Sequence, residues 1–306
     1  MASTTSTEAE VLKSYWIETY LKELESNLVL YKLGKMSKHP KNTGTQVHWL
    51  SIANLSAAAA LTEATDPTSY TLSAGDITAG LTQFGASIEI SDKLEETAIS
   101  GYMAELKKKV VRNAQMTIDN VGIRDAILSG GGLAQYAGSA VARNSLAQDS
   151  AFYLTVDEVR DATRTLKRAD VQPHTNGNYV CVHHVDATYD LMGDASWKDY
   201  IKYFAGDRIV KGHIGDMYGV SFIETADAYL SADLGSASAD VYQSYVFGDE
   251  AFGISEFYNS KIIVKNPHPS SDLELYSTIG WKSMFAAKAL QQSALIRIEH
   301  TSSYGT

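Results

Sequence analysis

The chain has 306 residues, of which 44% are hydrophobic and 20% charged, so it can bury the core of one large or two modest domains. No stretch approaches the about 18 consecutive apolar residues that a membrane helix needs. Its net charge of −10 disfavours general nucleic-acid binding, because an acidic surface gains nothing by neutralising phosphates. The single cysteine, Cys181, excludes an internal disulfide and a cysteine-based zinc or iron–sulfur site.

The first segment predicts a loose arm followed by a helix. Residues 1–10 are rich in Ser, Thr, Ala and Glu, and they lack the basic and apolar regions of a secretory signal, so we expect a protein that is kept in a cytoplasm. Apolar side chains then recur at every fourth position, as on one face of a helix. They are Leu12, Trp16, Tyr20, Leu24 and Leu28. Gly34 marks the expected end of this helix.

Residues 45 to about 90 predict a long, thin β-hairpin. The segments 45–55 and 77–91 have strand-like patterns, and a Thr- and Ser-rich stretch with a turn signal at Asp66-Pro67 lies between them. So narrow a ribbon buries little of itself, and two-stranded ribbons are marginal alone in water. We therefore expect the hairpin to pack on a neighbour, with Trp49 contacting another chain.

The clearest element is a helix from Ser100 to about Leu128, in which no proline occurs. The positions that form its stripe follow helical spacings. They are Met103, Leu106, Val110, Thr117, Val121 and Leu128. At about 1.5 Å per residue the helix would be about 42 Å long, which is unusual for a compact domain. Glycines 130–132 should end it, and the lysines at 107–109 predict a solvated face.

A mixed α/β region follows a Gly- and Ala-rich loop. Thr155 and Glu158 have the spacing of a capping box at a helix start, flanked by Leu154 and Val159 as a hydrophobic staple. From residue 178 onward, strand and helix patterns alternate. Residues 281–300 predict a strand or short helix and then a strand.

One stretch, VCVHHVDATYDL at 180–191, looks like a catalytic or metal site, since His183, His184 and Asp186 are potential ligands or a base with its carboxylate. Side chains alternate along a strand, so the two histidines should point to opposite faces and cannot easily chelate one ion. Asp186 suits the N-cap of a following helix at 187–192. We therefore favour a structural junction, with His184 bonding the backbone, and predict no catalytic, cofactor-binding or metal-binding residue.

The order of elements resembles the Hong Kong-type capsid fold of tailed bacteriophages, which is also found in herpesvirus shells. In addition, residues 61–99 are similar to a run in the major capsid proteins of phages that carry a large virion RNA polymerase and of related prophages. The matching residues are Leu61, Thr62, Glu63, Pro67, Leu72, Phe84, Gly85, Ile90, Ser91 and Asp92. Further similar stretches are QYAG at 135–138, LTVDEVRDATRTLK at 154–167, residues 184–191, VFGDEAFG at 246–253 and IGWKSMFAAKAL at 279–290. The likeness covers about 45–300 and departs from the family at His184-Val185, where the family has a His-Pro pair.

This resemblance implies an α+β fold with an N-terminal arm, an extended hairpin called the E-loop, a long spine helix, a peripheral (P) domain and an axial (A) domain. The implied boundaries are 1–44 for the arm with its helix, 45–92 for the E-loop, 93–175 for the P domain with a spine helix at about 100–129, 176–258 for the A domain and 259–306 for closing P-domain strands.

The function that the resemblance implies is that of a major capsid protein. Such a chain self-assembles into pentamers and hexamers of an icosahedral head around double-stranded DNA, without sequence-specific binding, catalysis, cofactor or membrane. The expected partners are other copies of the chain, a portal protein and a scaffolding protein, with a decoration protein as a further candidate. The shell would assemble in the bacterial cytoplasm and remain in the virion.

The working residues would then be contacts between subunits, in the arm, the hairpin and the A-domain loops at 197–207. The predicted contact residues are Trp49, Leu61, Pro67, Tyr70, Phe84, Trp197 and Tyr203. Two alternatives stay open: an encapsulin-like compartment shell of the same fold, and a soluble enzyme that uses His184 and Asp186.

Overall fold

The computed structural model describes residues 28–305 except for 53–56, 59, 62–65, 67–68, 73, 98–101, 131, 175, 205–214, 266–272 and 274. For residues 95–97, 102–104, 128–130, 200–204 and 259 it describes the backbone alone. The predicted N-terminal helix lies outside the described residues up to residue 27, and its last residues, Leu30–Leu33, form a 3₁₀ turn that ends at Gly34 as expected. Within them, no helix combines the length and the apolar character needed to cross a membrane.

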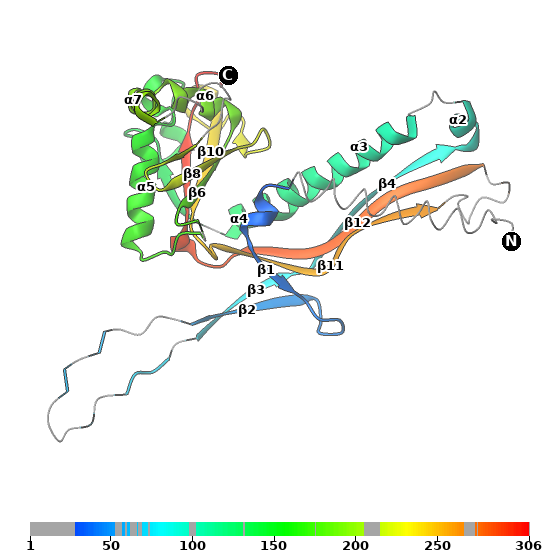
Figure 1. Cartoon of the computed structure of the whole chain (residues 1–306), viewed down its shortest axis with the longest axis horizontal. Coiled ribbons are helices and arrows are strands. Elements are labelled where there is room, and N and C mark those ends of the chain that lie inside the picture. The colour runs from blue at the N-terminus through cyan, green and yellow to red at the C-terminus, as the bar shows by residue number, and fades with distance from the viewer. Residues whose placement is uncertain are drawn as a thin grey trace.

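The described chain forms a lobe, a long extension and a hairpin (Figure 1). From here on, "arm" means this long extension and not the predicted N-terminal arm. The lobe contains a mixed sheet with helices packed on it. The arm is a four-stranded sheet with one long helix along it, and it extends from the lobe to the opposite end of the molecule. The hairpin leaves the lobe end of the arm and projects away from both.

The arm sheet has the strand order β1-β11-β12-β4, with bounds Lys35–Lys38, Phe252–Lys265, Tyr276–Ala289 and Thr82–Ser91. Only the β1–β11 pair is parallel. Strand alternation gives the sheet two unlike faces. Ile90, Ile279 and Phe285 are buried on the face that the helix covers, which we call the helix side. The other side, which we call the open face, carries glycine, serine, threonine and lysine.

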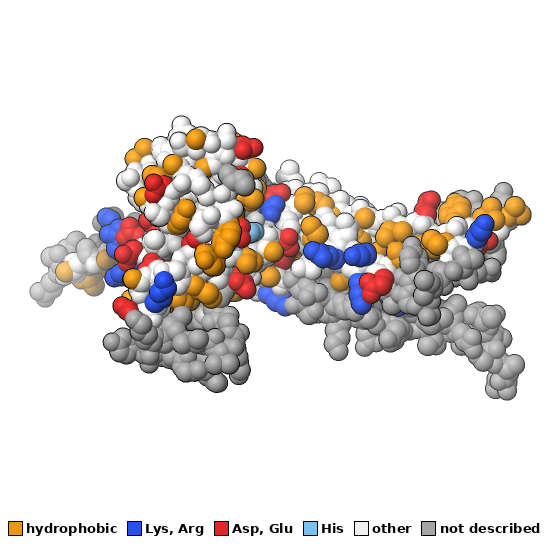
Figure 2. Space-filling view, turned by 90° about the horizontal axis from the view of Figure 1, so that it is seen from above, with side chains coloured by type: hydrophobic (Ala, Val, Ile, Leu, Met, Phe, Trp, Pro, Cys, Tyr) orange, Lys and Arg blue, Asp and Glu red, His pale blue; other side chains and the backbone are white. Residues whose placement is uncertain are grey.

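The long helix along the arm runs almost without interruption from α3 (Tyr102–Met116) through a π-helical segment (Thr117–Arg124) to α4 (Asp125–Gly130). A short helix, α2 (Asp92–Thr97), precedes it. The predicted long helix is present, and its solvated face carries exposed Lys108, Lys109 and Arg112. Figure 2, seen from above, shows the arm as a narrow extension of the lobe with lysine, arginine and hydrophobic side chains along it.

The π-helical segment occurs where the helix crosses Phe285 of β12. A Cβ added at Gly122 would lie 2.2 Å from Cζ of that ring, so only glycine lets the helix approach this closely. The same segment places the buried Asp119 at the start of a 3₁₀ turn (Leu30–Leu33), where its carboxylate accepts the backbone N–H of Val29 at 2.6 Å and of Tyr31 at 3.3 Å. Burial raises the pKa of Asp119, against the lowering effect of these amide hydrogen bonds. π-Segments inside α-helices commonly mark functional positions.

The hairpin is shorter than predicted. β2 (Gln46–Ile52) pairs in antiparallel register with β3 (Ala74–Gly80), and we call this pair the ribbon. The predicted second strand continues beyond the ribbon, but its residues 82–91 form β4, which pairs along its whole length with β12. The prediction of a single hairpin to residue 90 is therefore wrong. The alternation of Ile88 and Ile90 with polar residues comes from burial under α3.

The lobe has a sheet with the order β5-β13-β10-β6-β8-β7 and β9 paired to β10. The strand bounds are Leu133–Tyr136 for β5, Leu295–His300 for β13, Val241–Phe247 for β10, Tyr179–His183 for β6, Val220–Glu224 for β8, Asp216–Met217 for β7 and Leu230–Ser231 for β9. The helices are α5 (Val156–Arg168), α6 (Val185–Gly193) and α7 (Ala195–Phe204). Short 3₁₀ turns lie at Arg143–Ser145, Ser150–Phe152, Ser236–Ser238 and Gln292–Ala294.

Two features of the lobe differ from the sequence-based expectation. α5 packs on β10 and β13, so a helix and a closing strand assigned to the P domain belong to the lobe sheet. The capping box at α5 is half formed. Thr155 accepts the Glu158 N–H as predicted, but the Glu158 carboxylate turns to the backbone N–H of Gly138 at 2.8 Å. The glutamate thus ties the loop before α5 to the helix.

Gly122→Ala should lower the free energy of unfolding by about 1–3 kcal/mol, because the new methyl group must displace the buried Phe285 ring. Urea unfolding followed by circular dichroism measures this change. Gly193→Ala is the matched control, since no atom lies within 4 Å of its added Cβ. Equal unfolding midpoints for the two variants would show that the crossing tolerates a side chain.

Candidate subunit-contact surfaces

The His183–His184–Asp186 stretch is a strand–helix junction. His184, not Asp186, is the N-cap of α6, and its Nδ1 accepts the Asp186 backbone N–H at 3.1 Å. The assignment of the cap to Asp186 is therefore wrong, because the helix begins two residues earlier than predicted. The Asp186 carboxylate lies 3.1 Å from the same nitrogen and accepts the Tyr242 hydroxyl at 2.9 Å. As predicted, His184 bonds the backbone.

His183 and His300 are buried in the core of the lobe. His183 is 0% exposed, and its ring meets Phe222 edge-on at 5.9 Å, whereas His184 faces Tyr242. His300 bonds Ser244 Oγ and the carbonyl of Thr301, each at 2.9 Å. Burial lowers the pKa of both histidines to about 4, so both are neutral at pH 7. Among the described residues, no group of three His, Cys, Asp or Glu side chains could hold a metal ion.

The predicted contact residues fall into different environments. Leu61 is 74% exposed, and Tyr70 is half exposed, with its hydroxyl donating to the Ala57 carbonyl at 3.1 Å. Phe84 is half-buried on the helix side, 5.3 Å from the Phe285 ring. Trp197 is only 3% exposed and packs edge-on against Phe222, so its side chain belongs to the core of its own chain. Pro67 and the side chain of Tyr203 lie outside the described residues.

Trp49, which we predicted to meet another chain, makes a contact within its own chain and is half-buried. Its indole lies over Gly253 of β11, with Cε2 and Nε1 each 3.1 Å from a Cβ added there. Val47, on the same side of β2, is 5% exposed. One face of the ribbon base is therefore used within the chain, because the lobe end of the arm sheet lies directly beneath it.

The opposite face of the ribbon is exposed and carries two large apolar side chains beside an ion pair between His48 and Asp76, at 2.7 Å. Leu50 is 72% exposed and Ile52 is 57% exposed, and strand alternation places both on the side away from Trp49. Leu61 and Leu72, in the connection between the strands, are also exposed. Other large hydrophobic side chains, such as Val141 and Leu273, are exposed elsewhere, but those of the ribbon and its connection share one projecting element, as is typical of a protein–protein contact.

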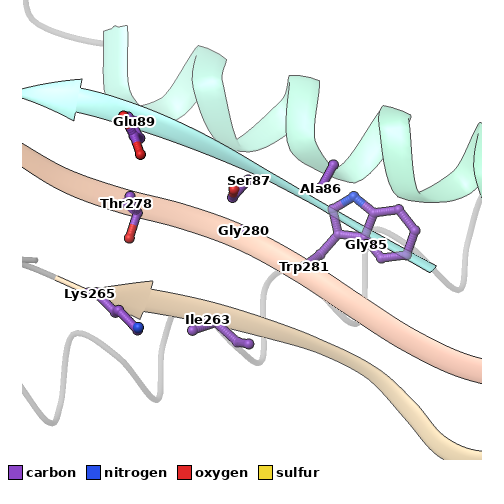
Figure 3. Close-up of a pocket in the computed structure, with 9 residues that line it drawn as sticks. All are labelled: Gly85, Ala86, Ser87, Glu89, Ile263, Lys265, Thr278, Gly280 and Trp281. Carbon is purple, nitrogen blue, oxygen red and sulfur yellow. The ribbon is translucent and has the colours of Figure 1, made fainter. Parts of the chain in front are cut away.

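A groove of about 390 Å³ lies on the open face of the arm sheet (Figure 3). Gly85 and Gly280 form its floor, since a Cβ at either would lie within 3 Å of a backbone oxygen of the neighbouring strand. Ser87 and Thr278 line it without filling it. Trp281 points from the same strands toward α3, where its Nε1 donates to Asn113 at 2.9 Å. The groove therefore admits another backbone close to the sheet.

Lysines lie along the groove and beyond it on the open face. Lys265 lines the groove, and Lys261 is paired directly opposite Lys282 across β11 and β12. Like charges in this position destabilise a sheet. Both ammonium groups also lie over the ring of Tyr258, at 5.2 and 5.8 Å from its centroid. An anionic partner would relieve their repulsion.

The ribbon and its connection have the complementary charge. Residues 46–80 contain Glu63, Asp66 and Asp76 but no lysine or arginine. The groove itself is lined by Glu89 as well as Lys265, so the surplus of positive charge on this face comes from Lys261 and Lys282 beyond the groove. A projection with acidic residues and a glycine-floored groove beside paired lysines therefore occur on the same chain. Sequence analysis missed the groove, because the facing of Gly85 and Gly280 depends on the register of β4 against β12. The sequence offered one signal for the groove, namely a glycine inside each of two strand patterns, Gly85 in β4 and Gly280 in β12.

Solved phage capsid structures have the same fold. The capsid of Ralstonia phage GP4 aligns with a TM-score of 0.67 at 14% identity, covering 88% of this chain and 87% of that chain. The capsid of cyanophage P-SCSP1u gives 0.65 at 13% identity, covering 90% and 89%, and the head of Helicobacter pylori bacteriophage KHP40 gives 0.62 at 12%, covering 89% and 91%. No protein-family model and no curated protein matches the chain. The α+β, Hong Kong-type fold class is confirmed.

Stability should fall in mild acid. His183 and His300 are neutral when folded, with pKa values of about 4, but bind protons at about pH 6.5 when unfolded, so the unfolded state takes up more protons as the pH drops. Their contribution is unchanged above pH 6.5 and is lost progressively down to about pH 4. We expect each to cost about 2 kcal/mol between pH 7 and pH 5.

Urea unfolding at the two pH values measures this loss. His183→Phe removes one of the two groups and should reduce the pH dependence by about half. His39→Gln removes a partly exposed histidine outside the lobe core and is the control. An undiminished pH dependence in His183→Phe would mean that other groups cause the acid sensitivity.

Proposed function

We propose that this chain is the major capsid protein of a tailed phage or prophage. In this proposal it assembles through pentamers and hexamers into an icosahedral shell around double-stranded DNA and has no catalytic role. Portal and scaffolding proteins are its expected partners, with a decoration protein as a further candidate. The shell forms in the bacterial cytoplasm and persists in the virion. The similarity at 61–99 favours the group of phages that carry a large virion RNA polymerase.

The observation that carries the proposal is the two-faced ribbon on a capsid-like fold. One face of its base packs on its own arm sheet, and the other presents Leu50 and Ile52 to solvent. Burying apolar surface yields about 25 cal/mol per Å², so such a face is stabilised when another subunit covers it. In a closed shell the same contact recurs at every subunit, and individually weak contacts combine.

The groove and the lysine pair beyond it form the proposed receiving surface. The ribbon of one subunit, with the acidic connection between its strands, would lie along the open face of a second subunit's arm sheet, near Lys261, Lys265 and Lys282. Gly85 and Gly280 leave space for its backbone. Complementary charge of this kind mainly sets specificity and the rate of association. The arrangement is heterologous, so it builds rings and lattices rather than isolated dimers.

The enzyme alternative has a specific observation against it. His184 Nδ1 and the Asp186 carboxylate meet, but they are engaged by the Asp186 N–H and the Tyr242 hydroxyl in capping α6. Because Nδ1 accepts the Asp186 N–H, the neutral ring carries its proton on Nε2, so neither ring nitrogen has a free lone pair to act as a base on a substrate. The encapsulin-like alternative shares the fold and differs in what the shell encloses, so the shell contents separate the two.

Replacing Leu50 and Ile52 by Glu should abolish shell formation and leave the folded chain intact. Two buried carboxylates at a subunit contact cost several kcal/mol, whereas on an exposed ribbon they cost little. Negative-stain microscopy and sedimentation velocity of wild-type and variant protein measure assembly, and circular dichroism measures folding. The control His48→Glu changes a polar residue on the same face of β2.

A wild-type chain that stays monomeric under all conditions would overturn the proposal. Shells that enclose a protein cargo in place of DNA would favour the encapsulin-like alternative.

Charge reversal should localise the contact. Lys261→Glu with Lys282→Glu should weaken assembly, because the acidic ribbon then meets an acidic face. Adding Glu63→Lys and Asp66→Lys to the same chain should restore shells, as counted by microscopy. Lys167→Glu with Arg168→Glu, on the exposed end of α5, controls for net charge. Unchanged assembly in the first variant would place the ribbon elsewhere on the neighbour.

A further inference from the structure

The ribbon is joined to the arm sheet through a very short connection. β3 ends at Gly80 and β4 begins at Thr82, so Leu81 alone separates two strands that belong to different sheets. The Leu81 N–H donates to the Thr45 carbonyl at 2.9 Å and closes the base of the ribbon. A change of backbone angles at one or two residues is enough to swing such an element. The covalent connection alone therefore does not fix the direction of the ribbon.

A second attachment is made by Trp49. The indole lies over the backbone of Gly253, and Leu290 Cδ1 comes as close to the same point, so tryptophan and leucine meet above a residue with no side chain. Gly253 lies at the lobe end of the arm sheet and pairs with Lys35 on one side and Lys288 on the other. The contact thus attaches one point of the ribbon to a strand that is hydrogen-bonded on both edges.

The Trp49 indole is held by van der Waals packing, without a hydrogen bond from its Nε1. Trp49 Nε1 is buried and has no hydrogen-bond partner. A buried donor without an acceptor costs about 1–3 kcal/mol. Packing against Gly253 and Leu290 must offset this cost, so the contact is stable enough to orient the ribbon and weak enough to be broken by a competing contact.

We propose that Trp49 and Gly253 form a lock that fixes the direction in which the ribbon leaves the arm sheet. Trp49 is then a positioning residue for the subunit contact proposed above. Its indole, on the face toward the arm, determines where Leu50 and Ile52, on the other face, are presented. The consequence for shells rests on the proposed function, but the effect on ribbon direction does not.

Gly253→Ala tests the lock with the smallest available change. The added methyl group would lie 3.1 Å from Trp49 Cε2 and Nε1 and from Leu290 Cδ1. The strand itself accepts alanine, so the arm should fold and the indole should move. Trp49→Ala removes the lock from the other side. Gly75→Ala, on the ribbon, is the matched control, because its nearest neighbour is the Ser51 carbonyl at 3.9 Å.

Spin labels measure ribbon direction in the unassembled chain. Leu50→Cys on the ribbon and Glu89→Cys on the arm are both exposed. The natural Cys181 is fully buried and burial raises the pKa of its thiol to about 12, so it does not react with the label. Pulsed electron paramagnetic resonance should give one narrow distance for the parent and for Gly75→Ala. It should give a shifted or broadened distribution for Gly253→Ala and for Trp49→Ala.

Shell shape is the second measurement, made on chains without labels. Gly253→Ala and Trp49→Ala should give misshapen or open assemblies, and Gly75→Ala should give parent shells. An unchanged distance distribution in Gly253→Ala overturns the lock. A changed distribution with normal shells overturns its role in subunit contact. If the parent forms no shells, the proposed function fails while the distance measurement still decides the lock.

Discussion

A two-stranded ribbon cannot cover both of its own faces, and this constraint organises the whole molecule. The ribbon uses one face of its base against the arm sheet, through Val47 and Trp49, and leaves Leu50 and Ile52 in solvent. The arm sheet has the same imbalance, with the long helix on one side and an open face on the other. In the proposed shell, each of these two surfaces is covered by the other on a neighbouring subunit.

On the helix side of the arm, the long helix approaches the sheet closely. Gly122 lets the helix pass over Phe285, and the π-helical segment absorbs the extra residue that this crossing requires. The segment also turns Asp119 toward the backbone amides of residues 29 and 31, so the incoming chain is tied to the same crossing. The arm is therefore rigid where ribbon, helix and lobe meet, which is the place from which a projecting contact element is best directed.

Function and stability use different polar groups in this chain. In the lobe, His300 is hydrogen-bonded, His183 is buried among apolar side chains without a hydrogen-bond partner, and Arg143 pairs with the buried Glu299 at 2.6 Å. On the arm, Lys261 and Lys282 oppose each other in solvent. A residue pair that is unfavourable within one chain and favourable across two is the signature of a surface shaped by assembly. This contrast, more than any single motif, supports a structural role.

The sequence by itself determined the elements with strong local periodicity. The long helix, the Thr155 cap, the strand–helix junction after His183 and the thin hairpin all follow from spacing and cap chemistry, and their order was enough to suggest the capsid fold. Local patterns could not show where β4 pairs, because a strand alternates in the same way in a ribbon and under a helix. The boundaries that the resemblance implied placed α5 and β13 in the P domain, whereas β13 is a strand of the lobe sheet and α5 packs on it, since sheet membership is a long-range property.

Only the tertiary structure decided which side chains remain for a partner. Trp49 and Trp197 both suggested contact surfaces as isolated aromatic residues, yet Trp197 lies in the lobe core and Trp49 rests on Gly253. Conversely, Leu50, Ile52 and the paired lysines drew no attention in the sequence. Exposure depends on what the rest of the chain packs against each residue, and that packing is fixed by strand register across the arm, which no local pattern encodes.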